Sequence, residues 1–284
     1  MIAIGKTNVL IITRQSDYGL YLAAADDAAG REILLPTRYV TPEMHIGNSI
    51  EVFVYKDSAD RPVATTDMPA AQVGQCAFLR VTDVNDIGAF LDWGLPKDLL
   101  VPFAEQKARM RVGGTYPVYI YLDHATQRIA ATAKIERYIG NIIPAYQRGD
   151  EVSCLVESIT DIGYKVIVDN LHHGMIYLNE TYAELHRGQL VKAHVKRIRP
   201  DFKIDLTIGG KAPDRVEALA GSIISRLHAN AGVMHITDAS PAAVISATFA
   251  CSKRDFKKAI GKLYKDRRIT ISDTEIRLAT HPVK

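Results

Sequence analysis

Apolar and polar residues alternate with period two along much of residues 1–210, and the alternation recurs in three copies. In each copy an apolar segment is followed by a glycine at one fixed distance, since 47−36, 113−102 and 188−177 all equal 11. From each glycine, apolar residues stand at the third, fifth and seventh positions. The segments are Leu34–Pro36, Leu100–Pro102 and Met175–Tyr177. Because the copies are longer than most solenoid units, each is predicted to be a small domain.

An Asp-x-Gly triplet precedes each apolar segment, at Asp17–Gly19, Asp86–Gly88 and Asp161–Gly163, with spacings of 86−17 = 69 and 161−86 = 75 residues. We expect these glycines where a strand bends sharply around a small barrel, a place that needs no side chain. The period-two pattern predicts five strands in each copy, and five strands are typical of an OB-type barrel. In the second copy the strands are expected at Gln75–Val84, Gly88–Trp93, Leu99–Pro102, Thr115–Asp123 and Arg128–Lys134.

A short helical turn is expected between the third and fourth strands of each copy. The three turns are placed at Thr41–Met44, Ala104–Met110 and Glu180–Leu185. Trp93 stands three residues after Phe90, so period two turns it to the opposite face of its strand. Trp93 is therefore predicted to lie in the core.

Residues 211–284 change from the period of a strand to the period of a helix. A first helix is predicted over 214–229, and a second with Ser240 as N-cap and Pro241 at its first position. A third helix begins after Ser252 and runs through Arg267. Its predicted buried stripe is Phe256, Ala259, Ile260, Leu263 and Tyr264. Strands over 269–271 and 275–278 follow, and three helices with a β-hairpin describe a winged helix.

The predicted fold is therefore mainly β with a C-terminal α+β module. Breaks in composition at 67–70, 140–144 and 209–213 act as linkers. The predicted domains are barrel 1 (1–67), barrel 2 (68–141), barrel 3 (142–210) and the winged helix (211–284).

Composition and charge indicate where the protein is located and what kind of partner it binds. A hydrophobic content of 47% and a charged content of 24% are ordinary for a folded protein. No run approaches the ~20 apolar residues of a membrane helix and no cleavable leader is evident, so we expect a cytoplasmic protein without a membrane partner. Cys76, Cys154 and Cys251 lack paired spacing and are expected to be reduced, buried thiols.

The positive charge of the chain is concentrated in its last module. Residues 211–284 carry 13 basic and 7 acidic side chains, a balance of +6, which points to a polyanion as the partner of this module.

The three repeats resemble S1-type RNA-binding domains, a branch of the OB fold. Asp86–Phe90 matches the aromatic-rich Asp-Phe-Gly-Ala-Phe strand of that pattern. Three such barrels followed by a winged helix resemble the conserved virulence factor B family of bacterial RNA-binding proteins. The resemblance implies a single-stranded RNA partner and a post-transcriptional role in gene expression.

The resemblance also carries RNA contacts to matching positions. In barrel 1 these are Tyr18, Tyr21 and Arg61, the last paired with Asp57; in barrel 2 they are Phe90, Asp123 and Arg128; in barrel 3 they are Lys165, Tyr177, Arg199 and Lys203. No copy holds the full pattern, so we expect a binding surface shared by several barrels. An exposed ring stacks on an unpaired base for roughly 1–3 kcal/mol, and nearby cations neutralise phosphate. The alternative is that these aromatic side chains only cover a sheet.

The third helix of the terminal module is rich in cations. Those assigned to RNA phosphates are Lys253, Arg254, Lys257, Lys258 and Lys262. The alternative is a solvated charged face that complements the helix C-terminus. Base-specific reading of DNA is less favoured, because the helix has few Asn and Gln side chains for bidentate contacts.

No catalytic pattern is evident. There is no phosphate-binding Gly-rich loop, nucleophile elbow or Cys/His ligand grouping, and the pair His172-His173 is expected in an exposed loop. We therefore expect a non-enzymatic protein without cofactor or metal. Two other functions fit the modules: a winged-helix transcription regulator that binds duplex DNA, and a ribosome-associated adaptor.

Overall fold

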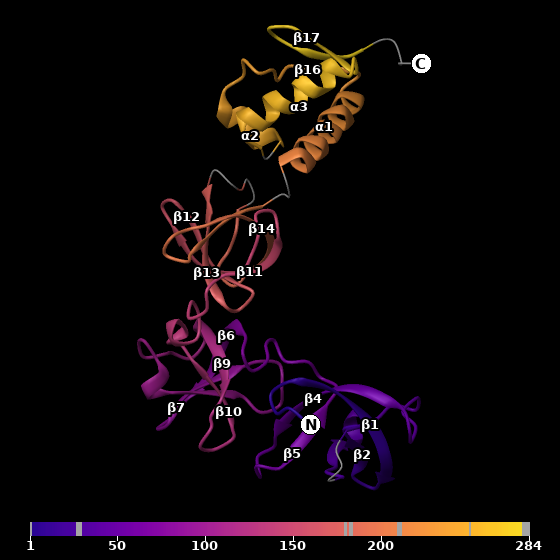
Figure 1. The fold of residues 1–284 in the computed structure, drawn as a ribbon, viewed down its shortest axis with the longest axis vertical. Helices are drawn as coiled ribbons and strands as arrows, with labels where there is room; N and C mark the ends of the chain where they lie inside the picture. Colours follow the sequence, from indigo (N-terminus) through magenta and orange to yellow (C-terminus); the bar gives the residue numbers. More distant parts are fainter. Residues whose placement is uncertain are drawn as a thin grey trace. The chain divides into compact units, whose positions relative to one another are not determined.

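The computed structural model describes residues 2–26, 30–178, 181, 184–208, 212–249 and 251–279. Within them the chain forms three five-stranded β units and a C-terminal helical module (Figure 1). It separates into two compact units, residues 1–139 and residues 140–284. The predicted fold class is confirmed.

The three β units follow one plan. Barrel 1 holds β1 (Thr7–Ser16), β2 (Gly19–Ala23), β3 (Ile33–Pro36), β4 (Ser49–Lys56) and β5 (Pro62–Thr65). Barrel 2 holds β6 (Cys76–Val84), β7 (Gly88–Asp92), β8 (Leu99–Pro102), β9 (Thr115–Leu122) and β10 (Ile129–Thr132). Barrel 3 holds β11 (Glu151–Thr160), β12 (Gly163–Val168), β13 (His172–Tyr177), β14 (Leu190–Ile198) and β15 (Ile204–Thr207). Barrels 1 and 3 close in the order first, second, third, fifth, fourth strand, and barrel 2 has the sheet order β10-β9-β6-β7-β8.

The glycine of each Asp-x-Gly triplet brings two strands together. Gly88 stands opposite Pro102, and a Cβ added to it would lie 2.3 Å from the carbonyl oxygen of Val101. Gly19 and Gly163 show the same approach, at 2.0 Å and 2.3 Å from the facing carbonyl oxygens. Only a residue without a side chain permits this backbone contact.

The second repeated glycine anchors the fourth strand to the first. The N–H of Gly113 donates to the carbonyl of Val81 at 2.9 Å, and that carbonyl comes just before the β-bulge of β6. Gly47 and Gly188 make the same bond in barrels 1 and 3. The fixed spacing of eleven residues thus gives the first and fourth strands the same register in all three barrels.

One hydrophobic cluster extends from barrel 2 into barrel 1, in addition to the separate core of barrel 1. Along β4, Val52 and Val54 point into barrel 1, so Phe53 and Tyr55 point outward, yet both are buried. They join a cluster that contains Trp93 and Leu99 of barrel 2. Trp93 is buried as predicted, and its indole N–H donates to the carbonyl of Lys97 at 2.7 Å.

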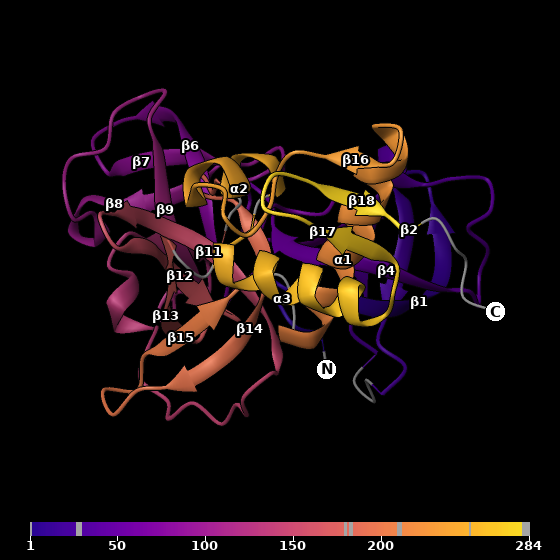
Figure 2. The same cartoon turned by 90° about the horizontal axis from the view of Figure 1, so that it is seen from above.

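The terminal module is a winged helix. It consists of α1 (Ala212–Ala229), β16 (Val233–Met234), α2 (Ala242–Phe249), α3 (Lys253–Lys265), β17 (Ile269–Ile271) and β18 (Ile276–Leu278). The strands pair in the order β16-β18-β17 beside α1 and α3 (Figure 2). Ser252 caps α3 as predicted, because its hydroxyl accepts the N–H of Asp255 at 2.9 Å. The short strand β16 was not predicted.

Several local predictions were wrong. A hydrogen-bonded turn does lie at Thr41–Met44, where the N–H of Met44 donates to the carbonyl of Thr41 at 3.1 Å. The helical turns of barrels 1 and 2 lie earlier than predicted, as 3-10 helices at η1 (Thr37–Tyr39) and η2 (Phe103–Glu105). Each follows the proline that ends the third strand, because proline has no N–H with which to continue the strand pairing. The turn expected at Glu180–Leu185 lies partly outside the described residues. Helix α2 begins at Ala242, and the Ser240 hydroxyl accepts the N–H of Thr237 instead of capping it.

Two side chains also differ from expectation. His172 is a buried residue of β13, where its ring packs edge to face on Tyr146 at 5.5 Å, and not part of an exposed loop. Tyr264 is 59% exposed, because the buried face of α3 is narrow and ends at Leu263. The three cysteines are buried thiols, as predicted. Among the described helices, none is long and apolar enough to cross a bilayer.

Candidate nucleic-acid interface

Strand pairing defines one outward row of four side chains on the same face of each barrel. Equivalent positions in the three barrels are found by aligning the glycines of the Asp-x-Gly triplets, Gly19, Gly88 and Gly163. Each of these glycines pairs with the last residue of the third strand of its barrel. In barrel 1 the row is Tyr21, Leu34, Val63 and Tyr55. In barrel 2 the corresponding residues are Phe90 and Leu100, paired across β7 and β8, and Tyr121 and Ala130, paired across β9 and β10. In barrel 3 it is Lys165, Met175, Asp205 and Arg197.

The row of barrel 1 is largely covered. The guanidinium carbon of Arg14 lies 3.4 Å from the ring centre of Tyr21, and Glu32 holds Arg14 by a 2.8 Å hydrogen bond. This bond lowers the pKa of Glu32 below its usual value. At the other end of the row, Val63 and Tyr55 are buried against barrel 2. The row therefore offers little open ring surface.

The other predicted contacts of barrel 1 lie at its turns. Tyr18 is 74% exposed at the turn between β1 and β2. The Arg61 guanidinium forms two hydrogen bonds with Asp57, at 2.9 Å and 2.8 Å. Asp57 also accepts the backbone N–H of Ala59 at 2.8 Å, so this pair shapes the turn between β4 and β5.

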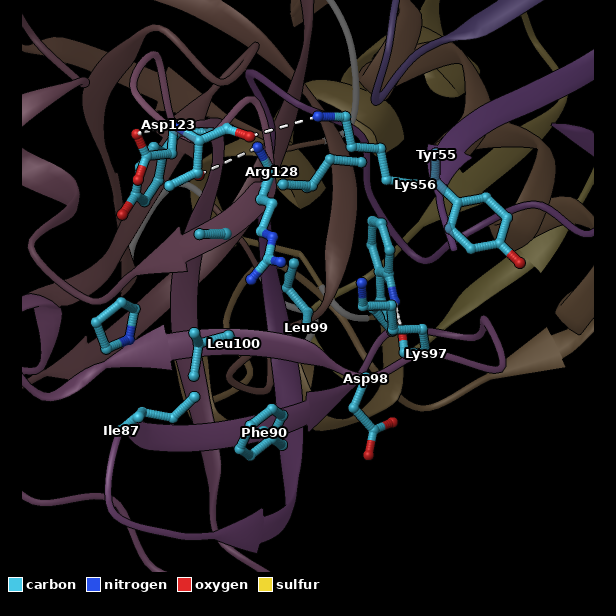
Figure 3. A pocket seen from close by; sticks show the side chains of 16 residues that line it. Tyr55, Lys56, Ile87, Phe90, Lys97, Asp98, Leu99, Leu100, Asp123 and Arg128 are labelled. Atoms are coloured by element: carbon cyan, nitrogen blue, oxygen red, sulfur yellow. Dashed lines mark hydrogen bonds between the residues drawn. The ribbon is translucent and has the colours of Figure 1, made fainter. Parts of the chain in front are cut away.

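The row of barrel 2 lines a pocket of 270 Å³ (Figure 3). Phe90 and Leu100 come from adjacent strands on one side, and Tyr121 and Ala130 from β9 and β10. Trp93 and Leu99 add apolar surface, and barrel 1 contributes Tyr55 and Lys56. The pocket thus combines an aromatic and aliphatic lining with residues of two barrels.

The pocket also has a charged rim. Its charged lining residues are Lys56, Lys97, Asp98, Asp123 and Arg128. Asp123 accepts the backbone N–H groups of Ala125 and Thr126, at 2.8 Å and 3.3 Å, and these bonds lower its pKa. Asp98 accepts the hydroxyl of Thr82 at 2.7 Å. Phe90, Asp123 and Arg128, which the sequence singled out separately, are brought together here.

A stack of three tyrosines supports the pocket wall. The ring of Tyr138 lies 4.3 Å from that of Tyr119 and 5.9 Å from that of Tyr121, with both pairs nearly parallel. Burial raises the pKa of Tyr121 to about 12, so its hydroxyl stays protonated near neutral pH and can donate a hydrogen bond. This stack was not predicted, because its local signal in the sequence is no more than the period-two pair Tyr119 and Tyr121.

Barrel 3 carries charges where barrels 1 and 2 carry rings. The buried carboxylate of Asp205 accepts Arg197 Nε at 2.6 Å, and Arg199 Nε lies 3.3 Å from its other oxygen. Lys203 pairs with Asp201 at 3.2 Å. Lys165 is exposed, and Tyr177 is half-buried opposite Gly163. Much of this positive charge is neutralised within the barrel, and the four residues of the row include no aromatic ring.

In the winged helix, the predicted cations of α3 divide into two groups. Lys253 donates to the carbonyl of Ser240 at 3.0 Å, Lys257 lies 3.5 Å from Asp238, and Lys262 forms an ion pair with Glu217 of α1. Arg254 and Lys258 are exposed.

Arg254 and Lys258 share one face of α3 with Gly261 and Lys265, at spacings of four, three and four residues. The exposed ring of Tyr264 stands beside this face. The arrangement places an exposed aromatic ring among exposed positive charges. Among the described residues, no group of three or more His, Cys, Asp or Glu is placed to hold a metal ion.

The fold and the rows define the class: S1-type OB barrels joined to a winged helix. An S1 domain model matches residues 4–67 and 73–134, and a CvfB-like winged helix domain model matches residues 221–278. The chain belongs to the conserved virulence factor B family.

Three bacterial proteins of similar length resemble this chain. The protein YitL of Bacillus subtilis (strain 168) is 26% identical over 274 residues, which cover 93% of this chain and 90% of YitL. Conserved virulence factor B of Staphylococcus aureus (strain USA300) is 24% identical over 243 residues, 83% of this chain and 81% of that protein. A crystal structure is known of a multidomain protein with nucleic acid binding domains from Streptococcus pneumoniae. Its sequence is 26% identical to this one, the match covers 97% of this chain and 98% of that chain, and the TM-score is 0.40.

Proposed function

We propose that this protein is a non-enzymatic, cytoplasmic, single-stranded RNA-binding protein that regulates gene expression after transcription. The observation that carries the proposal is the pocket of barrel 2, because it joins an aromatic lining to cations at its rim. Stacking platforms next to phosphate-neutralising charges are how proteins hold unpaired nucleotides. Membership of the conserved virulence factor B family supports RNA as the polyanion.

The size of the pocket favours an unpaired base. Its 270 Å³ falls just below the roughly 300–1,000 Å³ of sites for drug-sized ligands, which suits one flat base and excludes a paired stem. Phe90 supplies the ring on which the base stacks, and Asp98 is an acceptor for an N–H group of the base, such as the ring N–H of uracil. Arg254 and Lys258 of α3 add phosphate contacts that depend on salt and not on sequence.

The test uses the single tryptophan of the chain. Trp93 lines the pocket, so its fluorescence reports binding there directly. We expect an unstructured 12-nucleotide oligouridine to change this fluorescence. Phe90→Ala should weaken its binding by about 5- to 150-fold, which corresponds to the loss of one stacked base at roughly 1–3 kcal/mol. Ile46→Ala, which removes an apolar side chain 62% exposed in barrel 1, is the matched control. Equal affinity of Phe90→Ala and Ile46→Ala would contradict the proposed role of the pocket.

A second candidate function is binding of duplex DNA by the winged helix, which the exposed face of α3 favours. Competition separates the two functions. If RNA is the ligand, duplex DNA displaces bound oligouridine only at large excess. If the winged helix is the main binding element, duplex DNA competes efficiently, and Phe90→Ala leaves the affinity of the protein for duplex DNA unchanged. An adaptor role predicts instead that the protein sediments with ribosomes after nuclease treatment.

A further inference from the structure

Asp60 of barrel 1 reaches the rim of the barrel 2 pocket. It lies in the turn between β4 and β5, and its carboxylate binds the guanidinium of Arg128 in a two-pronged arrangement. Arg128 Nε donates to Asp60 Oδ1 at 2.9 Å, and Arg128 Nη2 donates to Oδ2. One barrel thus presents an anion to a residue that lines the pocket of the other.

Two further cations gather around this carboxylate. Lys97 Nζ donates to the carbonyl of Asp57 at 3.1 Å, and Lys56 Nζ donates to the carbonyl of Thr126 at 3.4 Å (Figure 3 shows the latter bond). The hydrogen bond from Arg128 lowers the pKa of Asp60, and attraction to Arg128, Lys97 and Lys56 lowers it further. The carboxylate is therefore ionised near neutral pH and lies in a ring of three positive charges.

Such a ring suits a phosphodiester as well as a carboxylate. Arginine binds carboxylate and phosphate oxygens through the same pair of parallel N–H donors. The two lysines now donate to backbone carbonyls, which are weaker partners than a charged oxygen. The ring borders the lining of Phe90, Leu100 and Tyr121, so a phosphate held there belongs to a nucleotide whose base enters the pocket.

The ion pair is not what holds the two barrels together. The shared core around Phe53 and Trp93 joins them through buried apolar contacts. Asp60 and Arg128 are both substantially exposed, and an exposed pair adds little to stability. Asp60 can therefore leave Arg128 while the barrels stay packed.

We propose that Asp60 occupies a phosphate-binding subsite of the barrel 2 pocket and that an RNA phosphodiester displaces it from Arg128. This inference rests on the proposed function, because it names the backbone contact of the same site. Asp60 then acts as an internal competitor: each nucleotide that enters the pocket must first exchange a carboxylate for its own phosphate.

The experiment is a double-mutant cycle on the full chain. Affinity for oligouridine is measured by Trp93 fluorescence for the wild type, Asp60→Asn, Arg128→Gln and the double variant. Salt is kept at roughly 0.15 M, where charges farther apart than about 8 Å are screened. We expect Asp60→Asn to bind about two- to five-fold more tightly, the range that an exposed ion pair is worth. In the Arg128→Gln background the same substitution has no such effect.

Glu51→Gln is the matched control, because Glu51 is an exposed acid on β4 and its loss changes the net charge equally. The inference is overturned if Asp60→Asn binds no more tightly than Glu51→Gln, or if the gain persists without Arg128. An unchanged urea midpoint of Asp60→Asn shows that the barrels stay packed. Loss of affinity in Phe90→Ala with no gain in Asp60→Asn would reject the phosphate subsite and retain the base pocket, whereas a wild type that does not bind RNA rejects the proposed function itself.

Discussion

Phe53 of barrel 1 and Trp93 of barrel 2 meet edge to face, with ring centroids 5.7 Å apart and planes at 83°. Both side chains are buried in one cluster that extends across the two barrels. The indole N–H of Trp93 is bonded to the carbonyl of Lys97, which fixes the ring at the edge of the pocket. The packing of the barrels and the shape of the candidate site therefore depend on the same contact.

Phe53→Ala should destabilise residues 1–139 by about 3–5 kcal/mol, because truncating a buried Phe leaves a cavity and also removes apolar burial. Urea unfolding followed by Trp93 fluorescence measures the change, and the emission of the folded variant should move to longer wavelength as water reaches the indole. Val9→Ala, at a position 65% exposed on β1, should stay within about 0.5 kcal/mol of the wild type. Equal stability of the two variants would show that the barrels do not rely on this contact.

Two glycine substitutions should act with opposite sign. Gly88→Ala should cost about 1–3 kcal/mol, since its Cβ would lie 2.3 Å from a backbone oxygen that has no room to move. Gly221→Ala, inside α1 where nothing lies within 4 Å of the new Cβ, should stabilise the winged helix by up to about 1 kcal/mol. Thermal unfolding of the two variants tests both, and a stabilised Gly88→Ala would refute the close approach of β7 and β8.

Alkaline pH should weaken the fold through Tyr121. Burial raises its pKa in the folded state from 10.0 to about 12, so the folded protein keeps a proton that the unfolded chain loses. The stabilising contribution is complete below pH 10 and is lost as the pH rises from 10 to about 12. Urea midpoints measured between about pH 9 and 11 should fall less steeply in Tyr121→Phe than in the wild type. Parallel curves would mean that Tyr121 ionises normally.

The exposed face of α3 should contribute to the salt dependence of RNA binding. Replacing Arg254 and Lys258 together by Ala should reduce the slope of log affinity against log salt by roughly 0.7 for each RNA phosphate that these side chains neutralise. Lys262→Ala is the comparison, because that side chain is already paired with Glu217. If Lys262→Ala lowers the slope as much as the double variant does, the ion pair with Glu217 does not keep Lys262 from binding RNA, and the division of the α3 cations into two groups is wrong.

The repeat was visible in the sequence because its causes are local. Each barrel needs a glycine where a backbone carbonyl of the neighbouring strand comes close, and a second glycine whose N–H bonds beside the bulge of the first strand. The spacing of these glycines therefore recurs in each copy. The cap at Ser252 and the inward position of Trp93 also follow from short-range rules, and both were predicted.

The features that were missed depend on contacts between distant residues. Phe53 and Tyr55 occupy outward positions of β4, and only the neighbouring barrel makes them core residues. Asp60 and Arg128 are 68 residues apart, so no local pattern links them. Tyr264 has helical spacing from Ile260, yet the narrow buried face of α3 leaves it in water. The candidate site was thus predicted as separate residues and not as a pocket.

The core shared by barrels 1 and 2 also decides how the chain can be dissected. A fragment ending near residue 67 would expose Phe53, Tyr55 and Val63 to solvent, and a fragment beginning near residue 68 would strip one side from Trp93. Either piece would tend to aggregate, and a failure to bind would say nothing of the intact protein. The N-terminal portion that keeps this shared core whole runs to residue 139, where the first compact unit ends.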